Sequence, residues 1–194
     1  MTAIEFFELH KDNDEKVKKL LEQCNRYLWE TQKTSVFSPC VVNTCEVLMR
    51  DVDSPVFIDP TGTTLLSTYF ADIYRRGMSV DRLLHSCKND ILERATKRND
   101  SINSNRPSDK KRTLMGFIEL KVSEIRDFTS DKNESENPQI LGIYDTALEA
   151  NLSHADICCL VPSTNALKKE VNDFFLAQVK NFICIECFSG ENQL

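Results

Sequence analysis

Residues 155–188, ADICCLVPSTNALKKEVNDFFLAQVKNFICIECF, carry the pattern on which the predicted fold depends. Two apolar runs, 155–162 and 181–188, are each long enough for one buried strand. Between them, apolar residues recur from Leu167 to Phe175 at the spacing of one helix face. A strand, a helix and a strand with short connections predict a βαβ unit, in which the two strands are parallel and the crossover is right-handed.

The rest of the chain alternates between strand-like and helix-like segments. Four more strands are predicted, at 40–50, 56–59, 113–122 and 140–144. The first two are expected to form a hairpin around a turn at 51–55. Helical periodicity and capping residues predict four more helices, at 14–33, 64–76, 79–92 and 145–154.

A turn at Gly77-Met78-Ser79 joins two of these helices into an αα-corner over about 64–97. The predicted fold class is therefore α/β. It consists of a mixed sheet flanked by helices, with a Rossmann-like βαβ unit at the C-terminal end and the αα-corner in the middle.

The composition indicates a single α/β domain over residues 1–194, because 41% of the residues are hydrophobic. The net charge of -6 gives the whole molecule no attraction to nucleic acid or to an anionic membrane. No apolar run approaches the ~20 residues that span a bilayer, and the N-terminus lacks a signal-peptide core. We therefore expect an intracellular protein, in the nucleus or cytoplasm, with no membrane contact.

The eight cysteines are expected to be reduced thiols that pack as small hydrophobic residues. Cys184 and Cys187 form a CxxC, but on the predicted strand they point to opposite faces, so no metal or redox site is expected. The histidines His10, His85 and His154 follow no metal or triad spacing. No cofactor is expected, because the sequence contains no GxGxxG and no phosphate-binding loop.

Residues 94–112 are polar and lack apolar periodicity. They contain two acidic and seven basic residues, the latter being Arg94, Lys97, Arg98, Arg106, Lys110, Lys111 and Arg112. We predict a flexible basic loop over 98–112 and a second polar loop over 129–138. The basic residues either form a solvated loop or contact nucleic-acid phosphates or an acidic partner. Their two clusters also resemble a bipartite nuclear-import signal.

VFIDPTGTTLL, residues 56–66, resembles the first motif of the haloacid-dehalogenase-like phosphatases and P-type ATPases. Over these residues only, the resemblance implies that Asp59 is a nucleophile that forms an acyl-phosphate, with Thr61 and Thr63 shaping the phosphate loop. The alternative is a tight turn, in which Asp59 closes a strand and Thr63 caps the next helix.

YRRGMSVDRLL, residues 74–84, resembles the turn of a helix-turn-helix, which would present Asp81, Arg82 and His85 to base edges. A plain αα-corner explains the same spacing.

The sequence shows no complete set of base, nucleophile and metal ligands, so we predict that the protein is not an enzyme. The leading hypothesis is a non-catalytic interaction subunit of an intracellular hetero-oligomer. Its docking segment would be IEFFEL, through Ile4, Phe6, Phe7 and Leu9, unless this segment packs on its own domain. Nucleic-acid association through residues 94–112 and phosphoryl transfer by Asp59 are the two alternatives.

Overall fold

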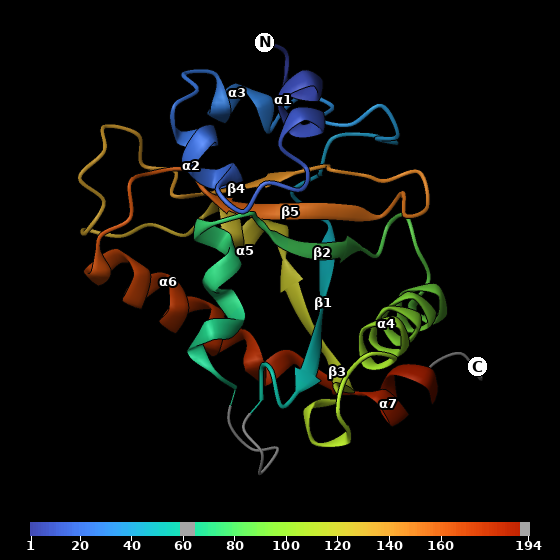
Figure 1. Ribbon diagram of the computed structural model, residues 1–194. Coiled ribbons are helices and arrows are strands. Elements are labelled where there is room, and N and C mark those ends of the chain that lie inside the picture. Colours follow the sequence, from blue (N-terminus) through green and yellow to red (C-terminus); the bar gives the residue numbers. More distant parts are fainter. Residues whose placement is uncertain (59–64, 191–194) are drawn as a thin grey trace.

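The computed structural model describes residues 1–58 and 65–190. Its centre is a six-stranded sheet with the order β4-β5-β2-β1-β3-β6, in which every neighbouring pair is antiparallel (Figure 1). The strands are β1 (Val47–Ser54), β2 (Met78–Arg82), β3 (Thr113–Lys121), β4 (Leu141–Tyr144), β5 (His154–Cys159) and β6 (Phe182–Cys184). The α/β class is confirmed, and the prediction of a mixed sheet is wrong, because no described strands pair in parallel.

The C-terminal strand–helix–strand order is present, but it does not form a Rossmann-like unit. Helix α6 (Asn165–Ala177) begins at the predicted cap, with Thr164 accepting a bond from the Leu167 N–H. The two strands that it joins run in the same direction but lie four positions apart in the sheet. They cannot pair, because β5 already has β4 on one side and β2 on the other.

The predicted hairpin turn and αα-corner are both replaced by strands. β1 runs straight through residues 51–54, and β2 begins at Met78, where the third helix was expected. The first helix of the corner is present as the 3-10 helix η1 (Ser67–Tyr74). Of the second, predicted over 79–92, only residues 88–92 are helical, at the start of α4 (Lys88–Asn103). Gly77 ends the η1 segment with a φ of 86°, a conformation that L side chains rarely adopt.

The N-terminal helices are short and lie above β4 and β5 in Figure 1. The predicted helix 14–33 is broken into α2 (Lys16–Leu21) and α3 (Arg26–Trp29). Before them, α1 (Ala3–Leu9) starts with a capping box between Thr2 and Glu5, which satisfies two N–H groups at the helix start.

The remaining helices are α4 (Lys88–Asn103), η2 (Ser108–Lys110), α5 (Val122–Arg126), η3 (Gln178–Asn181) and α7 (Ile185–Gly190). Residues 98–103 of the predicted basic loop 98–112 are therefore the end of α4, which corrects that boundary. The polar segment 129–138 contains no helix or strand. The predicted helix 145–154 is replaced by a loop over 145–153, with a bridge between Leu148 and Asn151, and by the first residue of β5.

The core is divided by the sheet. On one side of β1, Met49 packs with Ile91 of α4 and Phe188 of α7. On the other side, Leu48 and Val52 belong to a larger cluster that includes Phe70 of η1 and Phe175 of α6, whose rings stack with centroids 5.1 Å apart. Within the described residues, no helix has the length and hydrophobicity needed to cross a membrane.

Candidate functional site

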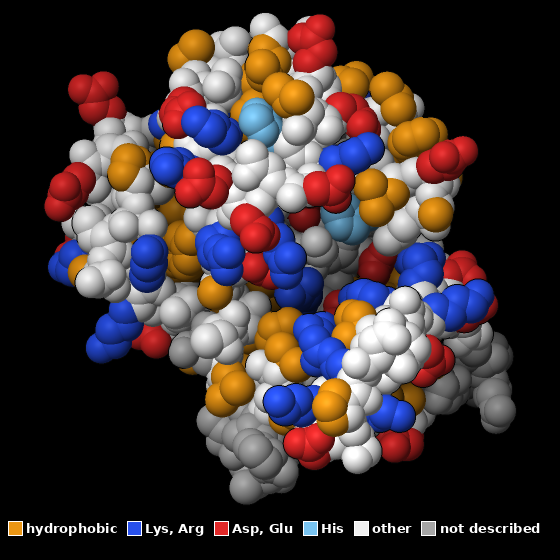
Figure 2. Space-filling view, in the orientation of Figure 1, with side chains coloured by type: hydrophobic (Ala, Val, Ile, Leu, Met, Phe, Trp, Pro, Cys, Tyr) orange, Lys and Arg blue, Asp and Glu red, His pale blue; other side chains and the backbone are white. Residues whose placement is uncertain are grey.

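A charged cleft of about 590 Å³ lies between the N-terminal helices and α4. Figure 2 shows a hollow there, surrounded by Lys and Arg side chains in blue and by Asp and Glu in red. Its floor consists of the parts of β1, β2 and β5 that neither group of helices covers. Two aligned strand pairs, Ser79 with Asp156 and Asp81 with His154, put four polar side chains on this face of the sheet.

Asp156 is the most strongly bonded residue of the cleft floor. The Lys16 ammonium lies 2.7 Å from its carboxylate, and the hydroxyls of Thr146 and Ser79 donate to it at 3.0 and 3.2 Å. Burial alone would raise the pKa of Asp156, but Lys16 outweighs this effect and holds the pKa below its ordinary value. Asp156 is therefore a fixed negative charge that positions its neighbours.

His154 lies beside this carboxylate, since positions 154 and 156 of β5 share a face. Its Nε2 is 4.0 Å from Asp156, while its Nδ1 is 3.0 Å from both the hydroxyl and the carbonyl oxygen of Thr146. The ring remains partly exposed at the cleft wall. His154 follows no metal or triad spacing in the sequence, and the structure places it beside Asp156 in the site.

Arg50 also lines the cleft, but it points to the opposite face of β1 from Asp51 and Asp53, where it is held in one orientation. Its Nη1 donates to the Ser79 carbonyl oxygen at 2.7 Å, and the guanidinium lies 5.6 and 5.3 Å from the ring centres of Phe57 and Tyr69. The side chain is almost fully buried, at 7% exposure, yet its Nε has no hydrogen-bond partner. A buried donor without an acceptor is costly, by about 1–3 kcal/mol.

Asp51 and Asp53 face α4 from the same strand. Arg98 binds Asp51 with two hydrogen bonds of 3.2 and 2.7 Å, and Asn99 donates to one oxygen of Asp53 at 2.6 Å. The other oxygen of Asp53 has no hydrogen-bond partner, although Arg98 lies 3.5 Å and Arg112 4.0 Å away. Burial, and then repulsion by Asp51, raise the pKa of Asp53.

Unpartnered polar atoms concentrate at this end of the cleft. Of the six such buried side-chain atoms in the described part of the chain, four belong to Arg50, Asp53, Asn99 and Arg112. Asn99 is bonded to Asp53, and the other three residues line the cleft directly. Most buried polar groups in proteins are paired, so these unpaired atoms distinguish this end of the cleft from the rest of the described core.

The electrostatic character of the cleft is mixed. Six basic and seven acidic residues are among the described residues that line it, so neither a simple anion nor a simple cation fits the whole site. No three His, Cys, Asp or Glu side chains within 1–58 and 65–190 are arranged to hold a metal ion. Two hydroxyls, of Ser79 and Thr146, donate to Asp156, and the Thr146 hydroxyl also lies 3.0 Å from the His154 Nδ1.

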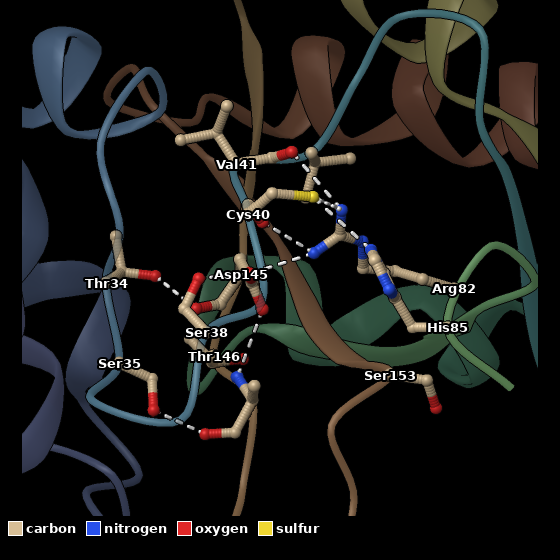
Figure 3. A network of polar contacts seen from close by, with 12 residues as sticks. Thr34, Ser35, Ser38, Cys40, Val41, Arg82, His85, Asp145, Thr146 and Ser153 are labelled. Atoms are coloured by element: carbon tan, nitrogen blue, oxygen red, sulfur yellow. Dashed lines mark hydrogen bonds and ion pairs between the residues drawn. The ribbon is translucent and has the colours of Figure 1, made fainter.

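A second polar centre lies under the loops beside the cleft (Figure 3). The fully buried Arg82 makes two 2.7 Å bonds to Glu46 and lies 2.8 Å from Asp145. It also donates to the carbonyl oxygens of Cys40 and Val41, at 2.8 and 3.2 Å. Burial would lower the pKa of Arg82, but these bonds hold it above its ordinary value.

This centre fixes two loops, 33–46 and 145–153, against each other. Thr34 donates to the Asp145 carbonyl oxygen at 2.6 Å, Ser35 donates to that of Ala147 at 2.5 Å, and Ser38 bonds the Asp145 carboxylate. The outer sides of the loops carry exposed apolar residues, which gather at the upper right of Figure 2. We call this the apolar loop surface, and it consists of Val36, Phe37, Val41, Leu148 and Leu152.

The seven basic residues of the predicted contact surface do not act as one group. Arg94 bonds Asp81 at 3.0 Å, Arg98 bonds Asp51, and Arg112 lines the cleft near Asp53, so three of them face carboxylates. Lys97 pairs with Glu93 on the exposed side of α4, while Lys110 and Lys111 are exposed and Arg106 is half-buried. Nucleic-acid contact through this set stays a prediction.

The four docking residues of the N-terminal segment are also divided. Phe6 and Phe7 are buried in their own domain, against Trp29 and Tyr144 at ring-centre distances of 5.2 and 4.8 Å. Ile4 is half-buried and Leu9 is exposed. The two phenylalanines therefore pack on their own domain, which was the alternative for this segment.

Asp59, Thr61 and Thr63, which the phosphatase-like motif singles out, lie outside the described residues. Arg82 and His85 do not belong to a recognition helix, because β2 and a turn occupy their positions. The cleft residues Arg50, Asp53 and Asp156 were not singled out as site residues. A charged residue inside an apolar strand was the only available signal, as in Leu48-Met49-Arg50-Asp51-Val52-Asp53.

Comparisons of the chain with protein-family models, with curated proteins and with solved structures found no match.

Proposed function

We propose that the protein is a binding protein whose cleft holds a small ligand with both an anionic group and a hydrogen-bond donor, as at the α-carbon end of an amino acid. The observation that carries this proposal is the set of buried, unpartnered atoms of Arg50 and Asp53, two residues that line the cleft. The sequence led us to expect a non-catalytic protein, and this proposal gives that protein a ligand-binding role.

The ligand chemistry follows from which atoms lack partners. The Nε–H groups of Arg50 and Arg112 are donors, and they match the oxygens of a carboxylate. The free oxygen of Asp53 is an acceptor, and it matches an ammonium or another N–H group. A molecule that carries both groups would offer a partner to each kind of free atom, whereas a simple anion would leave Asp53 unpaired.

The size and rigidity of the cleft also support binding. Ligand sites in proteins commonly measure about 300–1,000 Å³, and the volume of this cleft lies within that range. Arg50 is held against Phe57 and Tyr69 before any ligand arrives, which reduces the entropy lost on binding.

NMR signals of the arginine Nε–Hε groups test this proposal directly. We expect glycine to shift the Arg50 and Arg112 signals at a concentration about tenfold lower than acetate or methylammonium, since one additional charged hydrogen bond contributes about 1.5–3 kcal/mol. Arg106 is not among the residues that line the cleft, so its signal is the internal control.

Matched variants then assign the roles. Asp53→Asn should remove the preference for glycine over acetate and retain the acetate response, whereas Arg50→Gln should weaken the binding of both. Arg106→Gln should leave both responses unchanged. Equal responses to glycine and acetate in the unmodified chain, or shifts of the same size at Arg106, would contradict the proposal.

A second candidate is the interaction subunit, and the apolar loop surface favours it. Phe37 is 39% exposed and Leu148 45% exposed, although the loops beneath them are fixed by the buried Arg82. Exposed apolar side chains on rigid loops are typical of protein contacts, because such loops lose little conformational entropy when a partner binds.

Affinity purification with matched variants tests this candidate. We expect a protein retained by the unmodified chain to be lost with Phe37→Asp or Leu148→Asp. It should be kept with Leu9→Asp, which changes an even more exposed apolar residue on α1, away from these loops. Retention by all three variants would rule out this surface, and a monomer without retained protein would rule out the subunit role.

A further inference from the structure

Cys184 and Cys187 lie at the junction of a strand and a helix. β6 ends at Cys184 and α7 begins at Ile185, so the expected strand over 181–188 stops halfway. The helical turn brings the two side chains to the same side, and their Sγ atoms are 3.0 Å apart. The prediction that they point to opposite faces is therefore wrong.

The pair is also accessible. Cys187 is exposed and Cys184 is half-buried. Cys158 and Cys159, in contrast, are buried in β5, where burial raises the pKa of both thiols and keeps them protonated. Access and thiolate formation decide which thiols react, so these buried residues are structural and the Cys184–Cys187 pair can react.

The surrounding residues hold the pair in place. Phe188, next to Cys187, is fully buried and stacks on Phe117 with ring centres 4.2 Å apart. Opposite Cys184 in the sheet is Gly116, where a Cβ atom would lie only 2.2 Å from the Ile183 carbonyl oxygen. This glycine allows the last strand to pair, which fixes Cys184 at the start of α7.

We propose that Cys184 and Cys187 form a reversible dithiol–disulfide site that exchanges with low-molecular-mass disulfides such as glutathione disulfide. The Cys187 thiolate attacks one sulfur of the disulfide, which gives a mixed disulfide and releases one thiolate. The Cys184 thiolate then attacks the Cys187 sulfur, forms the internal disulfide and releases the second thiolate. The two protons lost by the cysteines end on the two released thiols, and the disulfide substrate is reduced as the protein is oxidised.

Mass spectrometry in glutathione redox buffers, after trapping of free thiols, tests this site. We expect the unmodified chain to lose two hydrogen atoms, with the new bond located in the peptide that contains residues 184 and 187. Cys184→Ser should instead accumulate one glutathione at Cys187, since the second step lacks its nucleophile.

Cys24→Ser, which removes an exposed thiol on another part of the chain, is the matched control and should behave as the unmodified chain does. Circular dichroism checks that each variant is folded. The proposal is wrong if the unmodified chain carries stable glutathione on Cys184 or Cys187 without the internal bond. It is also wrong if both thiols remain free when the buffer is fully oxidised.

Discussion

At the residue scale, the Asp53 carboxylate serves the proposed ligand binding but lowers the stability of the fold. Burial and Asp51 raise its pKa, so the fold favours the protonated form. The stabilisation from that proton is complete below the ordinary Asp pKa of about 3.9, and it is lost as the pH rises through the raised pKa. At neutral pH the ionised side chain therefore destabilises the fold.

We expect Asp53→Asn to stabilise the fold at neutral pH, because the amide oxygen can still accept the bond from Asn99 and no buried charge remains. Substitutions of this kind at functional sites commonly add about 0.5–2 kcal/mol. Thermal unfolding at a series of pH values measures the effect. The stability gained from Asp53→Asn should become smaller as the pH falls. A loss of stability at neutral pH would show that the attraction of Arg98 and Arg112 to the Asp53 carboxylate dominates.

Lys16 and Asp156 present the opposite case, an ion pair in which both side chains are at least 95% buried. Removing one partner of such a pair costs about 3–5 kcal/mol, since the other charge remains buried. We expect Lys16→Met to lose this amount in urea unfolding at pH 7, and Lys16→Met with Asp156→Asn to recover part of it. Lys11→Met, at an exposed pair, is the control and should change little.

The pairing of Lys16 with Asp156 also predicts how the stability of the fold changes at low pH. Because the pKa of Asp156 is lowered, its contribution is complete above about 3.9 and is lost as the pH falls through the lowered pKa. The unmodified chain should therefore lose stability in this range. The loss of unfolding free energy caused by Lys16→Met should become smaller in this pH range. A loss that stays constant from pH 7 to pH 3 would contradict the lowered pKa of Asp156.

At the scale of elements, the Arg82 centre connects β2 to the two loops of the apolar loop surface. Arg82→Met leaves Glu46 and Asp145 buried without their cation, so we expect a loss of about 3–5 kcal/mol. The loops 33–46 and 145–153 should become the first sites of limited proteolysis. Cleavage elsewhere first would show that other contacts hold these loops.

The elements that the sequence predicts well are those whose pattern is local. The strands predicted over 113–122 and 140–144 match β3 and β4 closely, and the helical spacing from Leu167 to Phe175 lies within α6. β2 was missed because Ser79 looks like a helix cap and Val80, Leu83 and Cys87 follow a helical spacing. Tertiary contacts make residues 78–82 a strand, since burial of Arg82 requires the ion pairs with Glu46 and Asp145.

At the scale of the whole molecule, the cleft could not have been predicted, because its residues come from distant parts of the chain. Lys16 and Asp156 are 140 positions apart, and Asn99 and Asp53 are 46 apart. Only the sheet order brings β1, β2 and β5 together, and short-range periodicity does not encode that order. The polar residues within the apolar strands were visible, but their partners were not.

The position of β6 has a consequence for the newly made chain. Only three of the nine residues of β3 pair along its outer edge. Their partner is β6, which leaves the ribosome after the other five described strands. Until then, the backbone of Gly116, Phe117 and Ile118 presents free N–H and C=O groups to other nascent chains. We expect ribosome-bound chains that end at residue 170 to associate, and chains extended beyond residue 190 to remain separate, as sedimentation of stalled complexes would show.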